Sequence, residues 1–125
     1  MHALAREAQV RATAAVRAGV RGTDVFGAAC DVFEAAGRAT LRTKRPDEVL
    51  HDGFTHGLGH GVGLEIYEPP ALGLEAHVRL RARDVVTIEP GCYRRGFGGV
   101  RVEDLVVVVD DGAEVLTRFP YDLAP

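Results

Sequence analysis

Two histidines stand four residues apart among closely spaced glycines, in the segment HGLGHGVGLEIYEPP at residues 56–70. On a helix, His56 and His60 would share one face as a zinc pair. Four glycines between residues 57 and 63 make a helix there costly, at about 1 kcal/mol each. An extended or looped strand also turns both imidazoles to one side, and the glycines let a backbone or a ligand approach closely. A phosphate-binding loop is disfavoured, because the pattern is not G-x-G-x-x-G.

Two later segments each place a carboxylate on a predicted strand: TIEPG at residues 87–91 and VRVED at residues 100–104. In a strand, Thr87 and Glu89 share one face, and Arg101 and Glu103 share another. Taken singly, such a glutamate is more typical of a solvated strand face than of a functional site. One imidazole with two carboxylates on adjacent strands is nevertheless a ligand set that Mn²⁺, Co²⁺ or Zn²⁺ accepts.

The elements that must position these residues begin with two helices. Residues 4–18 are rich in strong helix formers, and Gly19 follows where a helix would stop. A second helix is predicted over residues 23–36, where Thr23 takes the N-cap position and apolar residues recur at helical spacing. Residues 38–53 show no sustained period and predict a connecting loop.

After Phe54 the chain changes to glycine and β-branched residues, which favour strands. We expect strands over residues 85–88 and 100–109. The sequence DDG at residues 110–112 then predicts a turn into a returning strand over residues 113–116. Two helices followed by a run of strands predict an α+β fold.

Composition narrows the classes of partner. The 125 residues carry 15 Lys+Arg and 18 Asp+Glu, a formal charge of −3, with no basic stripe, so nucleic acid is not an expected partner. The apolar runs are far shorter than the ~20 residues that cross a bilayer, so we expect no membrane span. Without a secretory signal at its start, the chain is predicted to be cytoplasmic. Cys30 and Cys92 are predicted to be free thiols.

Together, the three segments resemble the C-terminal motifs of the methionine aminopeptidase and proline peptidase family, the pita-bread metallohydrolases. The match is nearest to the Xaa-Pro aminopeptidase and dipeptidase branch, and the two helices fit the same branch. It rests on HGLGHGVGL from residue 56, EPGCY from residue 89, GVRVED from residue 99 and LTRFPYDL at residues 116–123. The resemblance implies the C-terminal half of a pita-bread fold, with helices at about 3–37 and a curved, mostly antiparallel sheet whose metal-site strands span about 54–117.

Residue by residue, the resemblance implies that His60 and Glu89 bind one metal ion and that Glu103 bridges two, the ions being Mn, Co or Zn. In such enzymes a water or hydroxide held between the metals attacks the scissile carbonyl, and Glu89 is the expected partner for its proton. His56 matches a histidine near the substrate. Arg101 and Thr87 would hold the carboxylates in place.

This sequence departs from the family at one position inside the motifs and in two ligands that the family supplies from outside them. Tyr67 stands where the family has a second functional histidine; a phenol can donate a hydrogen bond but, with a pKa of ~10, cannot shuttle a proton near neutral pH. Two aspartate ligands, which the family supplies from an upstream strand pair, have no counterpart here. We therefore expect a partial metallopeptidase domain over residues 1–125, whose partner is the missing N-terminal half or a second copy of the chain.

The first functional hypothesis is metal-dependent hydrolysis of the N-terminal peptide bond of short peptides with proline in second position, performed by a complete catalytic domain. The isolated 125 residues are not expected to be active. One alternative is an inactive fragment or a non-catalytic module that keeps the fold for binding. Another is a creatinase-like hydrolase that acts on a non-peptide C–N bond without metal. The trio His60, Glu89 and Glu103 favours the metal-dependent hypothesis.

Overall fold

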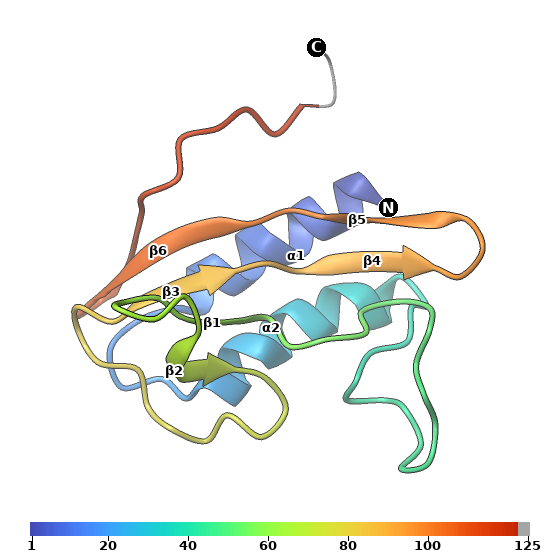
Figure 1. Ribbon diagram of the computed structural model, residues 1–125, viewed down its shortest axis with the longest axis horizontal. Helices are drawn as coiled ribbons and strands as arrows, with labels where there is room; N and C mark the ends of the chain where they lie inside the picture. Colours follow the sequence, from blue (N-terminus) through green and yellow to red (C-terminus); the bar gives the residue numbers. More distant parts are fainter. Residues whose placement is uncertain (123–125) are drawn as a thin grey trace.

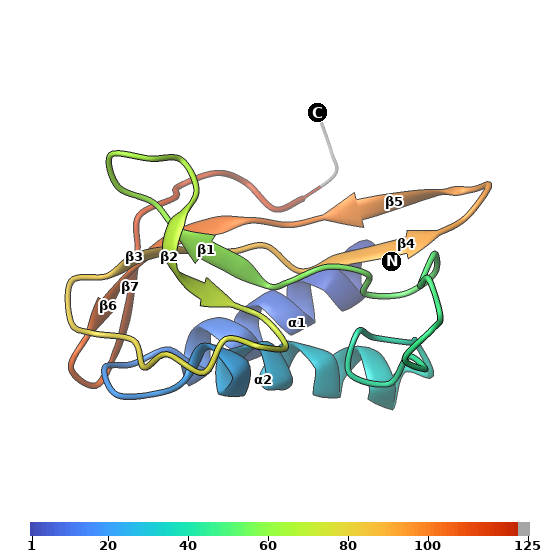
Figure 2. The same ribbon diagram turned by 60° about the horizontal axis from the view of Figure 1, so that its bottom comes forward.

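Two helices lie against one side of a sheet in the computed structural model, which describes residues 1–122 (Figure 1). Figure 2 shows the two layers edge-on, with both helices beneath the strands. The helices are α1 (His2–Ala15) and α2 (Gly22–Ala35). The strands are β1 (Gly59–Gly61), β2 (Glu68–Leu72), β3 (Val85–Ile88), β4 (Gly91–Arg94), β5 (Gly98–Arg101), β6 (Asp104–Val109) and β7 (Gly112–Val115).

The main sheet has the order β2-β1-β3-β6-β7, and every neighbouring pair is antiparallel. β4 and β5 form a separate hairpin, and Figure 1 shows them running on from β3 and β6. The predicted strand over residues 100–109 is therefore two strands, because the backbone leaves the ladder at Val102 and Glu103. The predicted turn at residues 110–112 is confirmed, since Val109 pairs with Gly112.

The helix boundaries differ from those predicted. α1 ends at Ala15, with Gly19 in the following turn at a φ of 84°. α2 is preceded by Arg21 rather than capped by Thr23. The backbone N–H groups of Gly22 and Thr23 donate to carbonyl groups of the loop before β3, so the helix needs no side-chain cap.

The core fills the space between the helices and the sheet. Phe26 and Phe33 of α2 pack on Phe54, and their ring centroids lie 5.6 and 4.9 Å, respectively, from the centroid of the Phe54 ring. From the sheet, Val86 of β3 and Val106 of β6 are fully buried against them. Cys30 and Cys92 are buried free thiols, as predicted.

The loop between α2 and β1 forms no regular helix or strand over residues 41–52, as expected for a connection. It is tied down at its ends. Thr40 forms an isolated bridge with Phe54, and Gly53 forms another with Tyr93. These bridges fix where the chain enters the glycine-rich segment that begins at His56.

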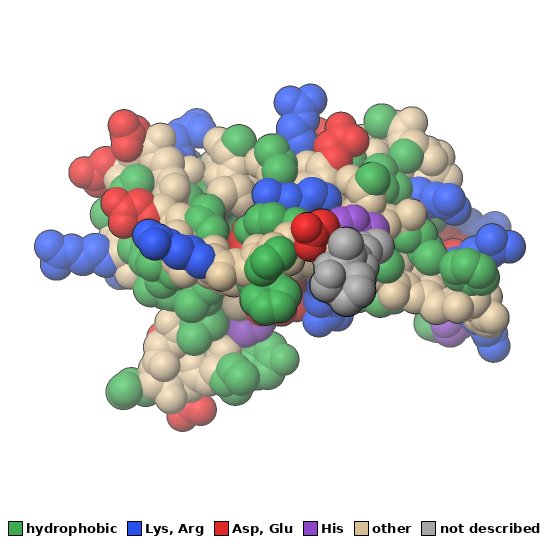
Figure 3. Space-filling view, turned by 90° about the horizontal axis from the view of Figure 1, so that it is seen from above, with side chains coloured by type: hydrophobic (Ala, Val, Ile, Leu, Met, Phe, Trp, Pro, Cys, Tyr) green, Lys and Arg blue, Asp and Glu red, His purple; other side chains and the backbone are tan. Residues whose placement is uncertain are grey.

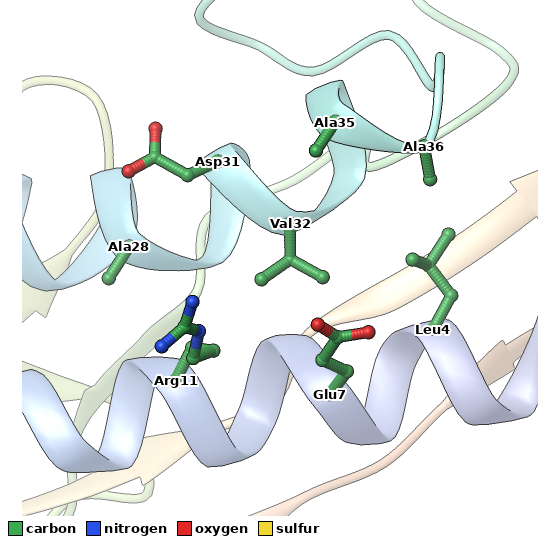
Figure 4. A pocket seen from close by; sticks show the side chains of 8 residues that line it. All are labelled: Leu4, Glu7, Arg11, Ala28, Asp31, Val32, Ala35 and Ala36. Carbon is green, nitrogen blue, oxygen red and sulfur yellow. The ribbon is translucent and has the colours of Figure 1, made fainter.

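A hollow of about 490 Å³ lies between the two helices, on the side away from the sheet (Figure 4). Glu7 and Arg11 of α1 face Ala28 and Val32 of α2 across it. It contains none of the histidines or carboxylates expected to do chemistry, so the candidate site has to be sought on the sheet.

Candidate active site

The pairing of β3 with β6 sets the two predicted site carboxylates side by side. Ile88 pairs with Asp104 in an antiparallel register. Glu89 follows Ile88 and Glu103 precedes Asp104, so both glutamates leave the ladder at the same end. The sequence motifs lie fourteen positions apart, and the register alone makes them neighbours.

Glu89 is buried and fully engaged. The residue is 8% exposed, which contradicts the alternative that it is a solvated strand glutamate. The Thr87 hydroxyl donates to its Oε1 at 3.0 Å, and the Arg101 guanidinium donates to its Oε2 at 2.9 Å. Thr87 and Glu89 thus share one face of the strand, as predicted, and Thr87 and Arg101 hold the two carboxylate oxygens.

His60 lies at the centre of β1 and reaches the same carboxylate. Its Nε2 is 3.3 Å from Oε1 of Glu89. Its backbone N–H donates to the Thr87 hydroxyl at 3.0 Å, which draws β1 close to β3. A side chain at Gly59 would collide with the Thr87 carbonyl oxygen, so a glycine is required beside the histidine.

His56 lies before β1, so the predicted extended strand does not reach it. Its Nδ1 donates to the Gly57 carbonyl at 2.6 Å, which leaves Nε2 to accept from the Tyr93 hydroxyl at 3.0 Å. Burial is the main cause that lowers the pKa of His56, in keeping with this neutral form. Arg101 Nη2 lies 3.3 Å from the same Nε2, so His56 and Glu89 meet through one guanidinium.

Tyr93 is a site residue that the sequence analysis missed. Its hydroxyl accepts from Arg101 Nε at 3.0 Å and donates to His56. The signal was present, because Tyr93 closes the EPGCY motif that begins at Glu89. Its place in the site depends on the β4–β5 pairing, which sets it near Arg101.

Tyr67 lies beside His60. The two ring centroids are 4.2 Å apart, and Tyr67 is 71% exposed. Both residues line a hollow of about 450 Å³, with Pro69 and Pro70 on its wall. An exposed phenol here is placed to meet a molecule that approaches His60.

Glu103 is the least constrained of the predicted ligands, since the residue is exposed. Burial of its carboxyl group, followed by the negative charge of Glu89, raises the pKa of Glu103. The effect of the Glu89 charge agrees with the strand register, which places Glu89 next to Glu103.

The residue types suit a divalent cation, but the geometry is incomplete. Within residues 1–122, no three His, Cys, Asp or Glu side chains form a group that could hold a metal ion. His60 and Glu89 are in contact, and Glu103 is a neighbour of Glu89 by strand register without completing such a group. The described residues therefore fit part of a metal site.

The comparisons with known proteins bear on this arrangement. A model of metallopeptidase family M24 matches residues 1–110, which include all three motifs. The chain belongs to metallopeptidase family M24. A family of that name is one of hydrolases that use divalent metals. The chain is 37% identical over 117 residues to a Xaa-Pro dipeptidase of Pyrococcus furiosus, a match that covers 94% of this chain and 30% of that protein.

Solved structures agree with the fold. A Xaa-Pro dipeptidase from Bacillus anthracis superposes with a TM-score of 0.84 at 34% identity, over 98% of this chain and 31% of that one. A prolidase from Pyrococcus horikoshii gives 0.84 at 31% identity, over 99% and 32%. The predicted α+β architecture of the pita-bread type is confirmed. The chain spans about 30% of the length of the relatives it matches.

Acidic and basic side chains are dispersed over the face in Figure 3, without a continuous basic band. Among the described residues, neither helix has the length and apolarity needed to cross a bilayer.

Proposed function

We propose that a catalytic domain containing this chain hydrolyses the N-terminal peptide bond of short peptides with proline in second position. One observation carries the proposal: a continuous set of contacts joins His60, Glu89, Arg101 and His56, so that all three motifs meet at one point. The names of the most similar proteins support the substrate class.

In this proposal Glu89 is the group that accepts and returns a proton. Its Oε2 is held by Arg101, while Oε1 is shared between the Thr87 hydroxyl and His60. A carboxylate with both oxygens oriented loses little freedom when it meets a substrate. Thr87 and Arg101 are then the residues that orient the base.

We assign two further side chains to the substrate. His56 is neutral, and its imidazole is fixed between Gly57 and Tyr93, which suits a hydrogen-bonding role without a charge. Tyr67 can offer its hydroxyl as a neutral donor to the scissile carbonyl.

His60, Glu89 and Glu103 are the proposed metal ligands, and the proposed ions are Mn, Co or Zn. Two such ions would act as Lewis acids and supply a hydroxide nucleophile near neutral pH. Both ions need about four to six donors each, more than these three side chains provide. We propose that the other ligands come from the N-terminal half of the catalytic domain, or from a second copy of the chain.

The incomplete metal geometry favours a second candidate, a module that keeps the fold for binding and does not hydrolyse. The cytoplasmic location and the partial-domain organisation over residues 1–125 stay predictions. Leu123, the last residue of the LTRFPYDL segment, lies outside the described residues.

The test of the first proposal is a chimera. The matching segment of the Pyrococcus furiosus Xaa-Pro dipeptidase is replaced by this chain, and hydrolysis of a Xaa-Pro dipeptide is measured. We expect turnover that a metal chelator abolishes. A folded chimera that binds the dipeptide without cleaving it would favour the binding module, and cleavage that survives the chelator would favour a creatinase-like reaction.

Calorimetry on the 125-residue chain tests the ligand assignment separately. We expect Mn²⁺ or Co²⁺ to show at most one weak site, which Glu89→Gln removes and Glu114→Gln, on exposed β7, leaves intact. Two tight equivalents would show that the chain holds ligands beyond the three named here.

A further inference from the structure

The segment that follows β7 returns to the beginning of β6. The Leu116 N–H donates to the Leu105 carbonyl at 2.8 Å, and the Leu105 N–H donates to the Thr117 hydroxyl at 2.8 Å. This second contact uses a side chain, so it depends on a residue type that can accept there. The segment thereby holds the backbone two residues beyond Glu103.

Tyr121 engages the residue in between. Its hydroxyl donates to the Asp104 carboxylate, lying 2.7 Å from Oδ1 and 2.6 Å from Oδ2. The Arg6 guanidinium of α1 lies over the Tyr121 ring, 3.5 Å from its centroid, and 3.9 Å from Asp104. Asp104 is only 3% exposed, so these partners replace the water that its charge has lost.

Asp104 faces the helices together with Val106 and Val108, which are buried on the same side of β6. Because side chains alternate along an extended chain, the residue before Asp104 points to the other face. That residue is Glu103. Fixing Asp104 on the helix side therefore fixes the side to which Glu103 points, and a slip of one residue would exchange them.

A third hollow brings the same segment to Glu103 directly. It measures about 270 Å³ and lies between Arg101 and Glu103 on one side and Phe119 and Tyr121 on the other. Tyr121 thus contacts Asp104 on the helix side and lines the space beside Glu103.

We propose that Tyr121 is a positioning residue for the Glu103 carboxylate, acting through Asp104. This inference rests on the proposed function, in which Glu103 is a metal ligand. Polar partners of this kind, which orient a ligand without touching the metal, are typically worth about 10- to 100-fold in metal affinity or activity.

The experiment uses the isotope-labelled 125-residue chain and Mn²⁺ alone as the probe, with paramagnetic broadening of the Glu103 and Glu89 resonances giving a Kd. We expect Tyr121→Phe to weaken Mn²⁺ binding about tenfold, and Arg118→Lys, at an exposed position of the same segment, to leave it unchanged. In the double variant with Glu103→Gln, Tyr121→Phe should add little, because both changes act on the same ligand. An unchanged Kd, or fully additive effects, would overturn the inference.

The metal-free chain separates this inference from the proposed function. If Mn²⁺ broadens nothing near Glu103, the metal assignment fails. The positioning role of Tyr121 is then judged from the chemical shift of the Glu103 side-chain carboxyl in the metal-free chain. If Tyr121→Phe changes the carboxyl chemical shift of Glu103 more than that of Glu89, the result supports the proposal that Tyr121 positions Glu103. An unchanged Glu103 chemical shift overturns the proposal. Thermal unfolding is followed for each variant. If Tyr121→Phe does not fold, Thr117→Val, which removes only the acceptor for Leu105, is read by the same criteria.

Discussion

Two arginines in this protein each stand at the centre of a cluster that contains at least one carboxylate, and only one of them belongs to the candidate active site. Arg42 donates to Asp31 at 2.5 Å and to Glu34 at 2.7 Å, and the Thr40 hydroxyl donates to the same Glu34 at 2.6 Å. All four residues lie between positions 31 and 42, and most of the cluster is open to solvent. This Arg42 cluster ties the end of α2 to the loop that follows.

The Arg101 cluster is assembled differently. Its partners Glu89, His56 and Tyr93 lie 12, 45 and 8 residues away in sequence. Its carboxylate is buried, and its members include an imidazole and a phenol that both accept hydrogen bonds from the same guanidinium.

The difference shows which feature indicates chemistry. A short arginine–carboxylate distance is present in both clusters and does not distinguish them. A buried carboxylate, a partner 45 residues away in sequence, and imidazole and phenol partners occur in the Arg101 cluster and not in the Arg42 cluster. Four predictions test this contrast. They are measured in the chimera with the Pyrococcus furiosus dipeptidase or in the chain itself.

The largest expected effect is on the proposed base. Glu89→Gln should lower kcat/KM on a Xaa-Pro dipeptide by roughly 10³-fold, because an amide cannot accept a proton. Glu34→Gln, the matched change in the Arg42 cluster, should leave kcat/KM unchanged. Similar losses from the two variants would mean that the Arg101 cluster acts only on folding.

The next effect concerns Tyr67, beside His60. Tyr67→His should raise kcat/KM by roughly 10²-fold, since an imidazole can change its protonation state near pH 7. Tyr67→Phe should lower kcat/KM by removing the donor. Equal kinetics for the three forms would show that Tyr67 packs beside Pro69 and Pro70 without contacting the substrate.

The guanidiniums themselves provide a third test. Arg101→Lys should lower kcat/KM roughly tenfold, because an ammonium group cannot hold Glu89, Tyr93 and His56 in one planar arrangement. Arg42→Lys should change thermal stability slightly and kcat/KM not at all. The reverse pattern, with Arg42→Lys the slower enzyme, would contradict the assignment of the site to the sheet.

The smallest effect is a pH dependence of stability in the Arg42 cluster. The hydrogen bond from Arg42 keeps the pKa of Glu34 below its ordinary value of 4.5. A depressed pKa stabilises the fold above the unfolded value, and this stabilisation is lost as the pH falls through the folded value. Glu34→Gln should therefore cost up to about 1 kcal/mol at neutral pH. The cost should shrink below about pH 4 in denaturant titrations; a constant cost would exclude the charge as its source.

The sequence alone was sufficient to predict the local features of this protein. Helical periodicity and glycine spacing predicted two helices, a connecting loop and the 110–112 turn, since these depend on neighbouring residues. The alternation of side chains in a strand was enough to put Thr87 beside Glu89. Helix ends were less predictable, because Gly22 and Thr23 are capped by a loop that lies more than fifty residues away.

Only the tertiary structure decided which of these residues meet. No local pattern predicts that Ile88 pairs with Asp104. This register is what sets Glu89 beside Glu103. The roles of Tyr93 and Tyr121 depend in the same way on a hairpin and on a returning segment. Contacts between distant positions follow from how the whole core packs, which fixes strand register, whereas residue type and spacing constrain only a residue's own neighbourhood.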